Sequence, residues 1–399
     1  MSPKVNYTFT SQFQRLKVGA ACNANEKLKI EPSTLKNSDS FIFSSSECPV
    51  FQRAQLTEIK KIPTVWKETF KIQLDSAIEY MPCDSIGLLV PNSDQIVDGI
   101  CKYCKFDNQR LKIERKGANG FIFDGMLRDF IKYRMDVNTI PKKKFLLELS
   151  KSSKKKNELE YICSSEGSRD YMSIGLRMST LLDILEEFEC EPTPEEFLLH
   201  CEILKPRYYS LIHEKGPAEI LLGVISKPID GEVVYGHVSR FIMEIYTEKL
   251  RLLSDRPDTD ASCSIPIEYC IRQNKLFEGF SSKNVVCFCT GTGIAPFISF
   301  YRRFLLTGTV ERLKLVYGFR FDQDNLLNYY DVNCDDVTLA KSSMGMHVYD
   351  FVDAISEFQN DCNVFICGNM KMQRDLFLRI KSRYPNLVEN KRIYFDNWT

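Results

Sequence analysis

Residues 285–297 read VVCFCTGTGIAPF. The apolar residues 285–289 predict a buried strand, and the glycines after them predict a tight turn that leads into a helix over residues 295–306. Gly291 and Gly293 would let the backbone approach a pyrophosphate, and the free N–H groups of the helix N-terminus favour such an anion. Because a strand, a glycine turn and a helix also occur together without a ligand, the stretch predicts a site only with support from elsewhere in the chain.

The rest of the last third repeats the alternation of strand and helix. Residues 313–317 and 363–367 predict two more strands, and a helix that ends near residue 384 follows the second. This order predicts a parallel sheet with helices on both faces. Residues 365–369 read FICGN, which places a thiol and a glycine at the carboxyl end of a strand, where ligands of such sheets bind.

The first two thirds begin as a β-domain that a helical block interrupts. Residues 70–74 alternate between apolar and polar side chains and residues 86–90 are continuously apolar, so both predict strands. Between about residues 126 and 203 the apolar period becomes helical, with Ser179 as an expected N-cap and residues 193–196 as a capping box. Strand-like segments return at residues 207–212 and 220–225.

The composition is that of an ordinary globular protein without a marked charge. The 399 residues include 53 Lys and Arg and 53 Asp and Glu, so no basic excess indicates a nucleic acid as partner. No uncharged apolar run reaches the ~18 residues of a membrane span, and the N-terminus lacks a secretory pattern. The sequence therefore predicts a soluble, cytoplasmic protein that binds neither nucleic acid nor membrane.

Cysteine and lysine patterns give no separate site. The 15 cysteines are expected to be reduced thiols, since no secretory signal accompanies them. Cys101 and Cys104 form a CxxC pair without a second pair at zinc-finger spacing, so core packing is favoured over metal binding. The lysines at residues 142–144 and 154–156 fit a solvated helix face better than a docking patch for an acidic partner.

Four motifs resemble, in order, those of ferredoxin–NADP reductase-type enzymes and of the diflavin reductases among them. The resemblance implies an α/β plus β-barrel fold, in which an FAD-binding antiparallel β-barrel with a helical insertion precedes a parallel-sheet NADP-binding domain. It also implies FAD and NADPH as cofactors. The motifs are RYYS at residues 207–210, GTGIAPF at residues 291–297, FICGN at residues 365–369 and YFDNWT at residues 394–399.

The domain boundaries combine this resemblance with composition. Residues 1–47 are rich in Ser, Asn and Lys, and residues 38–47 have the composition of a linker, so we expect poor order there. The expected domains are an FAD-binding β-barrel from residues 48–125 and 204–282, a helical connecting domain over residues 126–203, and an NADP(H)-binding α/β domain over residues 283–399.

The resemblance also implies roles for single residues around the flavin. Arg207 would bind the FAD pyrophosphate, Tyr209 would stack on one face of the isoalloxazine, and Trp398 would shield the other face until the nicotinamide displaces it. A terminal tryptophan that only packs into a core is the alternative. The residues implied to bind FAD or NADPH are Arg207, Tyr208, Tyr209, Ser210, Gly236, His237, Val238, Ser239, Thr290, Gly291, Thr292, Gly293, Arg320, Lys341, Cys367, Gly368, Asn369 and Trp398.

Three further positions match the group around the site of hydride transfer. Ser210, Cys367 and Asp396, together with Trp398, are the implied catalytic residues. Hydride transfer to a flavin asks the protein for alignment and charge stabilisation, and a carboxylate can favour the cationic nicotinamide product. Without these neighbours, Cys367 would be interpreted as a small residue at a buried strand end.

Several positions depart from the family pattern. Asn369 replaces an Asp, and Ala340-Lys341 stands where the family has Ser-Arg for the 2′-phosphate of NADPH. His347-Val348-Tyr349 lacks the Lys and Gln that the family uses for the same phosphate, and Leu211-Ile212-His213 replaces the small residues that follow RxYS in the family. A single ammonium recognises phosphate less well than a bidentate guanidinium, and Arg320 is expected to compensate, so NADPH is the predicted nucleotide.

The partner is predicted from the branch of the family. Residues 48–51, 80–84 with 90–93, and 140–146 resemble the branch that reactivates cobalamin-dependent methionine synthase more than the cytochrome P450 branch. A flavodoxin domain needs on the order of 100 to 200 residues, and about 48 precede the FAD module. A separate FMN-binding flavodoxin-like protein, or a longer form of this chain, is therefore expected to carry electrons onward.

Two alternatives remain open from the sequence. One is a general reductase whose acceptor is another flavodoxin, a cytochrome or a quinone. The other belongs to a different class, a flavin-binding or chaperone-like module without turnover, and the changes at Leu211, Tyr349 and Asn369 motivate it.

Overall fold

The computed structural model describes two compact units of the chain. Unit 1 comprises Met1–Val50, Leu89–Lys205 and Ile225–Ile245, and unit 2 comprises Phe51–Leu88, Pro206–Val224 and Tyr246–Thr399. Each unit is described separately. The described residues are 27–33, 35, 41–46, 48–77, 80, 81, 84–106, 109–117, 120–212, 217–255, 264–274, 282–305, 307–332, 337–358 and 361–396.

The first part of unit 2 is an antiparallel barrel of six strands in the order β8-β5-β12-β3-β4-β9. A bridge between Leu211 and Ile220 joins the two ends of this order and closes the barrel. The alternation predicted for residues 70–74 is confirmed, because Phe70, Ile72 and Leu74 are all buried. The strands are β3 (Gln52–Ile62), β4 (Thr69–Ala77), β5 (Ser85–Leu89), β8 (Arg207–Ser210), β9 (Pro217–Gly223) and β12 (Ile265–Arg272).

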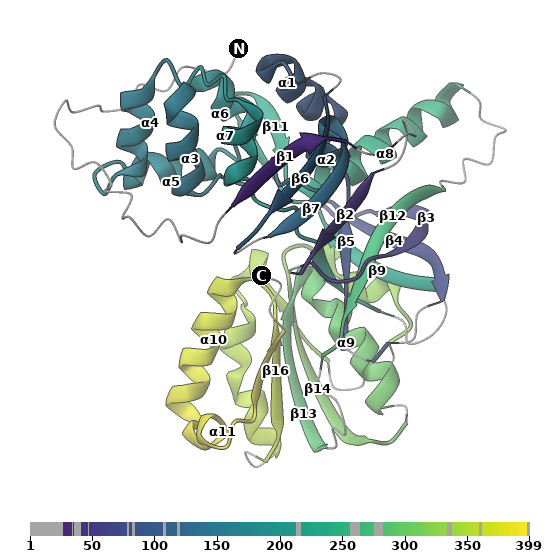
Figure 1. The fold of residues 1–399 in the computed structure, drawn as a ribbon. Coiled ribbons are helices and arrows are strands. Elements are labelled where there is room, and N and C mark those ends of the chain that lie inside the picture. The colour runs from purple at the N-terminus through teal and green to yellow at the C-terminus, as the bar shows by residue number, and fades with distance from the viewer. Residues whose placement is uncertain are drawn as a thin grey trace. The chain divides into compact units, whose positions relative to one another are not determined.

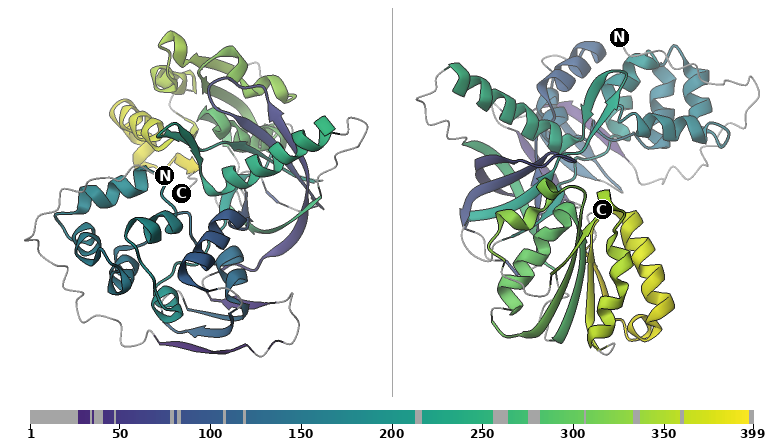
Figure 2. Two further views of the ribbon diagram at one scale, coloured as in Figure 1. Left: turned by 90° about the horizontal axis from the view of Figure 1, so that it is seen from above. Right: turned by 180° about the vertical axis from the view of Figure 1, so that it is seen from behind.

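The second part of unit 2 is a five-stranded parallel sheet in the order β15-β14-β13-β16-β17. Helices cover both of its faces, with α9 on one side and α10 and α11 on the other (Figures 1 and 2). The strands are β13 (Ser282–Thr290), β14 (Val310–Phe319), β15 (Val337–Lys341), β16 (Asn363–Cys367) and β17 (Ile393–Asp396), and the helices are α9 (Ala295–Phe300), α10 (Met370–Arg383) and α11 (Pro385–Glu389).

Residues 285–289 lie in strand β13, and the burial of this strand explains why they are all apolar. Val285, Cys287 and Cys289 pack into one core cluster, and Val286 and Phe288 pack into another. A strand buried on both faces shows no polar alternation. The predicted parallel sheet and the predicted fold class are confirmed, and the helix expected over residues 295–306 ends as α9 at Phe300 and continues as one π-helical segment, Tyr301–Leu305.

Short 3-10 segments connect the strands of the parallel sheet. They lie at the ends of β13, β14 and β15, and the longest covers one face of the sheet. The segments are η3 (Gly291–Ile294), η5 (Asp322–Asp324), η6 (Leu326–Tyr329), η7 (Ser342–Met344) and η8 (Val348–Phe358).

Unit 1 contains a four-stranded antiparallel sheet in the order β1-β6-β7-β2 and a set of helices. A hairpin of two strands and the first part of α8 complete it, and α8 ends in unit 2. The elements are β1 (Leu28–Pro32), β2 (Ile42–Ser45), β6 (Arg110–Arg115), β7 (Phe121–Met126), β10 (Ser226–Ile229), β11 (Glu232–Tyr235), α1 (Asp94–Cys104), α2 (Leu127–Tyr133), α3 (Lys143–Leu149), η1 (Ser150–Ser152), α4 (Lys156–Cys163), α5 (Ser168–Leu176), α6 (Leu181–Glu187), α7 (Pro194–Leu199) and α8 (His237–Asp255).

The helical block expected over residues 126–203 is confirmed by α2 to α7, with one wrong cap. Helix α6 is capped by Thr180 and not by Ser179, because Thr180 forms a capping box with Asp183. The capping box of Thr193 with Glu196 is confirmed, with Pro194 at the start of α7. In both helices the reciprocal bonds satisfy N–H groups that would otherwise lack a partner.

Two strands lie where the composition predicted irregular chain. Strand β1 pairs with β6, and strand β2, inside the expected linker, pairs with β7. Both are short and half-exposed, so they contain too few buried positions to produce a clear period of two. Residues 1–26, 34, 36–40 and 47 of the predicted N-terminal segment lie outside the described part.

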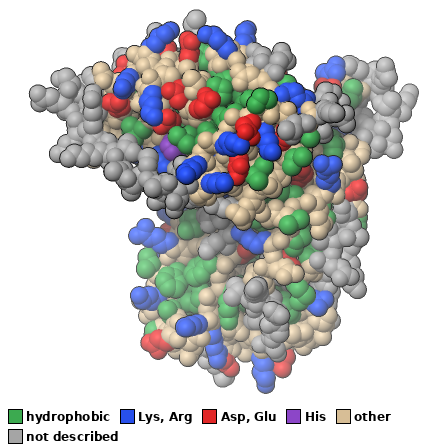
Figure 3. All heavy atoms as spheres, in the orientation of Figure 1, with side chains coloured by type: hydrophobic (Ala, Val, Ile, Leu, Met, Phe, Trp, Pro, Cys, Tyr) green, Lys and Arg blue, Asp and Glu red, His purple; other side chains and the backbone are tan. Residues whose placement is uncertain are grey.

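The surface of unit 1 carries mixed charge. Basic and acidic side chains are interspersed over the helical region at the top of Figure 3. Lys142 pairs with Glu202 at 2.9 Å, and Lys155 with Glu189 at 3.7 Å, which supports the solvated-face interpretation of the lysine runs. Across the described ranges, every helix is too short or too polar to span a lipid bilayer.

Candidate functional site

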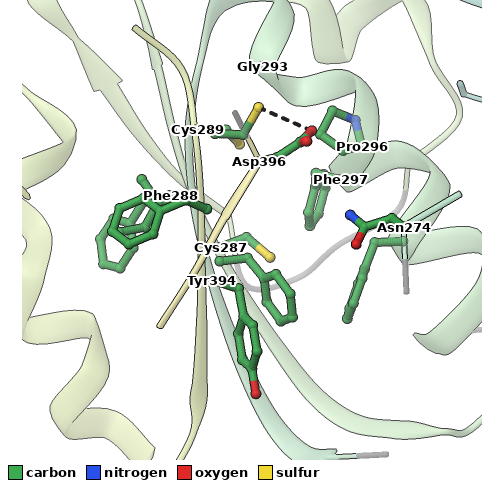
Figure 4. A pocket seen from close by; sticks show the side chains of 14 residues that line it. Asn274, Cys287, Phe288, Cys289, Gly293, Pro296, Phe297, Tyr394 and Asp396 are labelled. Atoms are coloured by element: carbon green, nitrogen blue, oxygen red, sulfur yellow. Dashed lines mark hydrogen bonds between the residues drawn. The ribbon is translucent and has the colours of Figure 1, made fainter. Parts of the chain in front are cut away.

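Three strand ends of unit 2 bring a hydroxyl, a thiol and a carboxylate together. Ser210, Cys367 and Asp396 are the last residues of β8, β16 and β17. Ser210 Oγ donates a hydrogen bond to Asp396 Oδ2 at 3.0 Å, and Cys367 Sγ lies 3.8 Å from the same oxygen. The dashed line in Figure 4 marks the thiol contact. The structure thus groups three of the four residues predicted as catalytic.

Backbone pairing fixes this group. Cys367 and Asp396 are partners across β16 and β17, and Cys289 and Cys367 are partners across β13 and β16. Ser210 and Cys367 are buried, with exposed fractions of 2% and 6%. Burial raises the pKa of the Cys289 thiol, so this neighbouring thiol is not a thiolate nucleophile. The arrangement suits orientation of a bound ring and stabilisation of positive charge.

A small cavity of about 40 Å³ lies beside this group and is mostly apolar. Figure 4 shows Phe297 and Tyr394 among the side chains that line it, with Asp396 near Pro296. The glycine turn closes on it, because a Cβ at Gly293 would lie 2.7 Å from the carbonyl oxygen of Cys367. Only glycine therefore fits at this position.

Glycine is favoured at Gly291 and at Gly368 for different reasons. Gly291 has a φ of +54°, while a Cβ there would meet no atom within 4 Å, so its backbone conformation is what favours glycine. A Cβ at Gly368 would lie 2.3 Å from Oγ1 of Thr290. These two positions place open backbone at the carboxyl ends of β13 and β16.

A larger cavity of about 660 Å³ extends over the carboxyl ends of the parallel strands. Its volume lies in the range of cofactor sites. One wall is the loop between β3 and β4 of the barrel, which contributes Thr64, Trp66 and Lys67. The parallel-sheet side contributes Thr290, Gly291, Thr292, Gly293, Gly318, Phe319, Arg320, Ala340, Ser342, His347, Tyr349, Gly368, Asn369 and Lys371, among others.

The charges of this cavity favour an anion. Lys67 and Arg320 both line it, and within the described part of the chain neither forms an ion pair with a carboxylate. Burial lowers the pKa of Lys67, as expected for an ammonium without a counter-charge. Asp324 also lines the cavity, but its carboxylate accepts the backbone N–H groups of Val65 and Trp66 at 2.8 and 2.9 Å.

Three residues that the sequence singled out for nucleotide binding, Lys341, Asn369 and Tyr349, make contacts with other groups of the protein. Lys341 Nζ lies 2.7 Å from Asp322 Oδ2, so its charge is partly compensated. Asn369, which replaces an acid, serves as the N-cap of α10 and accepts the N–H of Met372 at 2.9 Å. The ring of Tyr349 lies under the guanidinium of Arg379 at 4.3 Å, a contact that its motif did not reveal.

The predicted flavin residues of unit 2 lie along β8. Arg272 stacks over the ring of Tyr208 at 4.1 Å, and burial raises the pKa of Tyr208 to about 12. Burial also raises the pKa of Tyr209. Arg207 begins the same strand. Trp398 lies outside the described residues.

Residues 236–239, which the resemblance implies to bind a cofactor, lie in unit 1 at the start of α8. Gly236 donates its N–H to the carbonyl of Ile225 at 2.9 Å, and Ser239 Oγ accepts the N–H of Ile225 at 2.9 Å. His237 Nε2 lies 3.2 Å from the carbonyl oxygen of Pro91, and Val238 is buried. These contacts hold the loop at the N-terminus of a 19-residue helix.

Sequence reasoning missed Trp66, Lys67 and Asp324. They lie in connections between strands, where no periodic pattern marks them. A tryptophan and a lysine side by side just before the strand predicted at residues 70–74 were the available signal, but without an alignment they point to no ligand.

Comparisons with known proteins agree with this architecture. Residues 48–241 match the family model described as FAD binding domain. The chain is 26% identical to methionine synthase reductase of Homo sapiens over 67% of its own length and 43% of that protein. It is 26% identical to inducible nitric oxide synthase of Oryctolagus cuniculus over 62% of its length and 52% of that protein. It is 23% identical to NADPH-dependent diflavin oxidoreductase 1 of Candida albicans over 79% of its length and 57% of that protein.

The family model and the two sheets of unit 2 define a ferredoxin–NADP reductase-like fold with an FAD-binding domain. The chain is similar to diflavin reductases over part of its length. The chain spans about half the length of these relatives.

Proposed function

We propose that this chain is an FAD-dependent reductase that takes hydride from NADPH and passes electrons to an FMN-bearing carrier. The observation that carries the proposal is the convergence of Ser210, Cys367 and Asp396 on one carboxylate oxygen. FAD and NADPH are the cofactors that the FAD-binding domain and the diflavin reductase relatives support. When bound, FAD accepts two electrons as hydride and releases them singly.

The residues present fit these groups. For NADPH, Lys67 and Arg320 offer cations without a carboxylate partner among the described residues, and Gly291 leaves backbone open to a phosphate. For FAD, Arg207 and the ring of Tyr209 are the proposed binding groups in unit 2. Residues 236–239 of unit 1 stay a separate prediction, since a helix N-terminus favours a pyrophosphate. The proposed domains are the FAD-binding barrel of residues 48–125 and 204–282, the helical residues 126–203 and the NADP(H)-binding residues 283–399.

Ser210, Cys367 and Asp396 are proposed to orient the nicotinamide ring and to stabilise its positive charge. Ser210 holds the carboxylate of Asp396 through its hydroxyl, and Cys367 contacts it from the neighbouring strand. With the nucleotide bound, this carboxylate would stabilise positive charge on the nicotinamide ring. Trp398 is proposed to shield the flavin until the nicotinamide displaces it.

We propose that the electrons pass through an FMN carrier to cobalamin-dependent methionine synthase, which they reactivate by reduction. The similarity to human methionine synthase reductase over 305 residues supports it. A general NADPH–flavoprotein reductase with a cytochrome, flavodoxin or quinone as acceptor is the second candidate. The equal identity to an inducible nitric oxide synthase supports that candidate.

Anaerobic reduction tests the proposal and separates it from a flavin-binding module without turnover. NADPH or NADH is added to the FAD-loaded protein, and the flavin absorption band is followed. We expect NADPH to bleach the band. A band unchanged by both nucleotides would refute the reductase and favour the module. Capture of an FMN-binding flavodoxin, followed by transfer of electrons to it from the reduced protein, tests the carrier.

A further inference from the structure

The indole of Trp66 stacks on the guanidinium of Arg320 at the wall of the larger cavity. The guanidinium carbon lies 3.4 Å from the ring centre, and both residues line the cavity. We propose that Trp66 is a positioning residue that holds Arg320 ready to bind a phosphate of the dinucleotide. This inference rests on the proposed NADPH site and adds to it a residue of the barrel that acts on nucleotide binding.

The barrel loop that carries Trp66 is anchored on the sheet segment that follows Arg320. Asp324 Oδ1 accepts the N–H groups of Val65 and Trp66, and its Oδ2 accepts the N–H of Phe321 at 3.0 Å. Within the loop, Thr64 Oγ1 donates to the carbonyl of Lys67 at 2.7 Å. Because one buried carboxylate binds both segments, the indole and the guanidinium are held in a fixed relation.

Stacking leaves the useful donors of Arg320 free. The N–H groups of a guanidinium lie in its plane, and the indole covers only its face, so the edge remains available for two parallel bonds to a phosphate. A flexible arginine loses conformational freedom when it binds a ligand, whereas one already held loses less.

Among the described residues, the nearby Asp324 forms no ion pair with Arg320. Asp324 is four residues away and only 8% exposed, but its oxygens are occupied by backbone N–H groups. Trp66 itself is 60% exposed. An indole so exposed contributes little to a core. Among the described residues, the contact with Arg320 is therefore the main interaction of this ring.

A double-mutant cycle with 2′,5′-ADP tests the inference. This probe carries the phosphates but no nicotinamide, so its binding does not depend on hydride transfer. Binding is measured by calorimetry on the FAD-loaded full chain for Trp66→Ala, Trp66→Phe, Arg320→Gln and the double variant Trp66→Ala with Arg320→Gln. Val65→Ala is the matched control, because it alters an exposed neighbour with the same backbone bond to Asp324.

We expect Trp66→Ala to weaken binding about threefold to thirtyfold, the range of a cation–π contact. Trp66→Phe should retain most of the affinity, and Val65→Ala all of it. In the Arg320→Gln background, Trp66→Ala should have no further effect. Independent effects that multiply in the double variant would overturn the inference, as would a loss in Trp66→Phe equal to that in Trp66→Ala.

The outcome is distinguishable from failure of the proposed reductase. If 2′,5′-ADP binds with the expected coupling but NADPH leaves the flavin band unchanged, the inference stands and the reductase proposal fails. If NADPH bleaches the band and the cycle shows no coupling, the inference alone fails. If Trp66→Ala leaves nucleotide binding intact but abolishes capture of an electron carrier, Trp66 is a docking residue and the inference is overturned.

Discussion

Asp396→Asn should slow reduction of the flavin by saturating NADPH about thirtyfold. Asp396 accepts Ser210 Oγ at 3.0 Å and is paired within the sheet, so an amide of the same shape keeps its place. A full unit charge about 4 Å from a carboxylate gains about 4 kcal/mol at a partly screened site. A transition state with about half of that charge gains about 2 kcal/mol, which corresponds to a factor of about thirty in rate.

The assay is anaerobic stopped-flow absorption of the flavin band over a series of NADPH concentrations. The limiting rate reports charge stabilisation, and the concentration at half-maximal rate reports binding. Asp353→Asn is the matched control, because it removes another carboxylate of unit 2 that pairs with Arg383 at 2.6 Å. A limiting rate within twofold of the unmodified protein, or a change in the half-maximal concentration alone, would refute the reasoning.

Three more expectations concern the nucleotide site. Gly293→Ala should cost about 1–3 kcal/mol of stability, because its Cβ would lie 2.7 Å from the carbonyl oxygen of Cys367. The loss should appear as a lower midpoint of thermal unfolding, and an unchanged midpoint would contradict this expectation. Burial lowers the pKa of Lys67, so NADPH affinity, which needs the ammonium, should fall on the alkaline side at lower pH than for an ordinary lysine. Lys67→Met should weaken binding at neutral pH and remove that pH dependence in titrations; retention of the pH dependence would count against Lys67. Trp398→Ala should raise the use of NADH relative to NADPH in steady-state rates, and an unchanged preference would argue against ring shielding.

The parallel sheet could be predicted because its strands are buried on both faces and its turns need glycine. The FICGN stretch placed Cys367 at the end of β16, where the structure has it. The meeting of Cys367 and Asp396 with Ser210, 186 positions before Asp396, came from family resemblance and not from any local pattern.

The parts that could not be predicted depend on contacts between distant segments. Strand β2 has two half-buried positions, too few for a period, and gains its order from β7. The roles of Trp66 and Asp324 arise only when a barrel loop meets a segment about 260 residues later, and Val65 and Asp324 are 259 positions apart. The cap of α6 moved by one residue because Thr180, unlike Ser179, stands three positions before Asp183.

The loop between β3 and β4 forms one wall of the larger cavity, so separating the barrel from the parallel sheet should weaken nucleotide binding. A fragment of residues 283–399 would keep the glycine turn and lose Thr64, Trp66 and Lys67, so it should hold nucleotides poorly even when it folds. Conversely, exchanging the barrel for that of a relative would carry part of the nucleotide selectivity with it. Under the proposed function, such an exchange should therefore change nucleotide binding as well as the flavin environment.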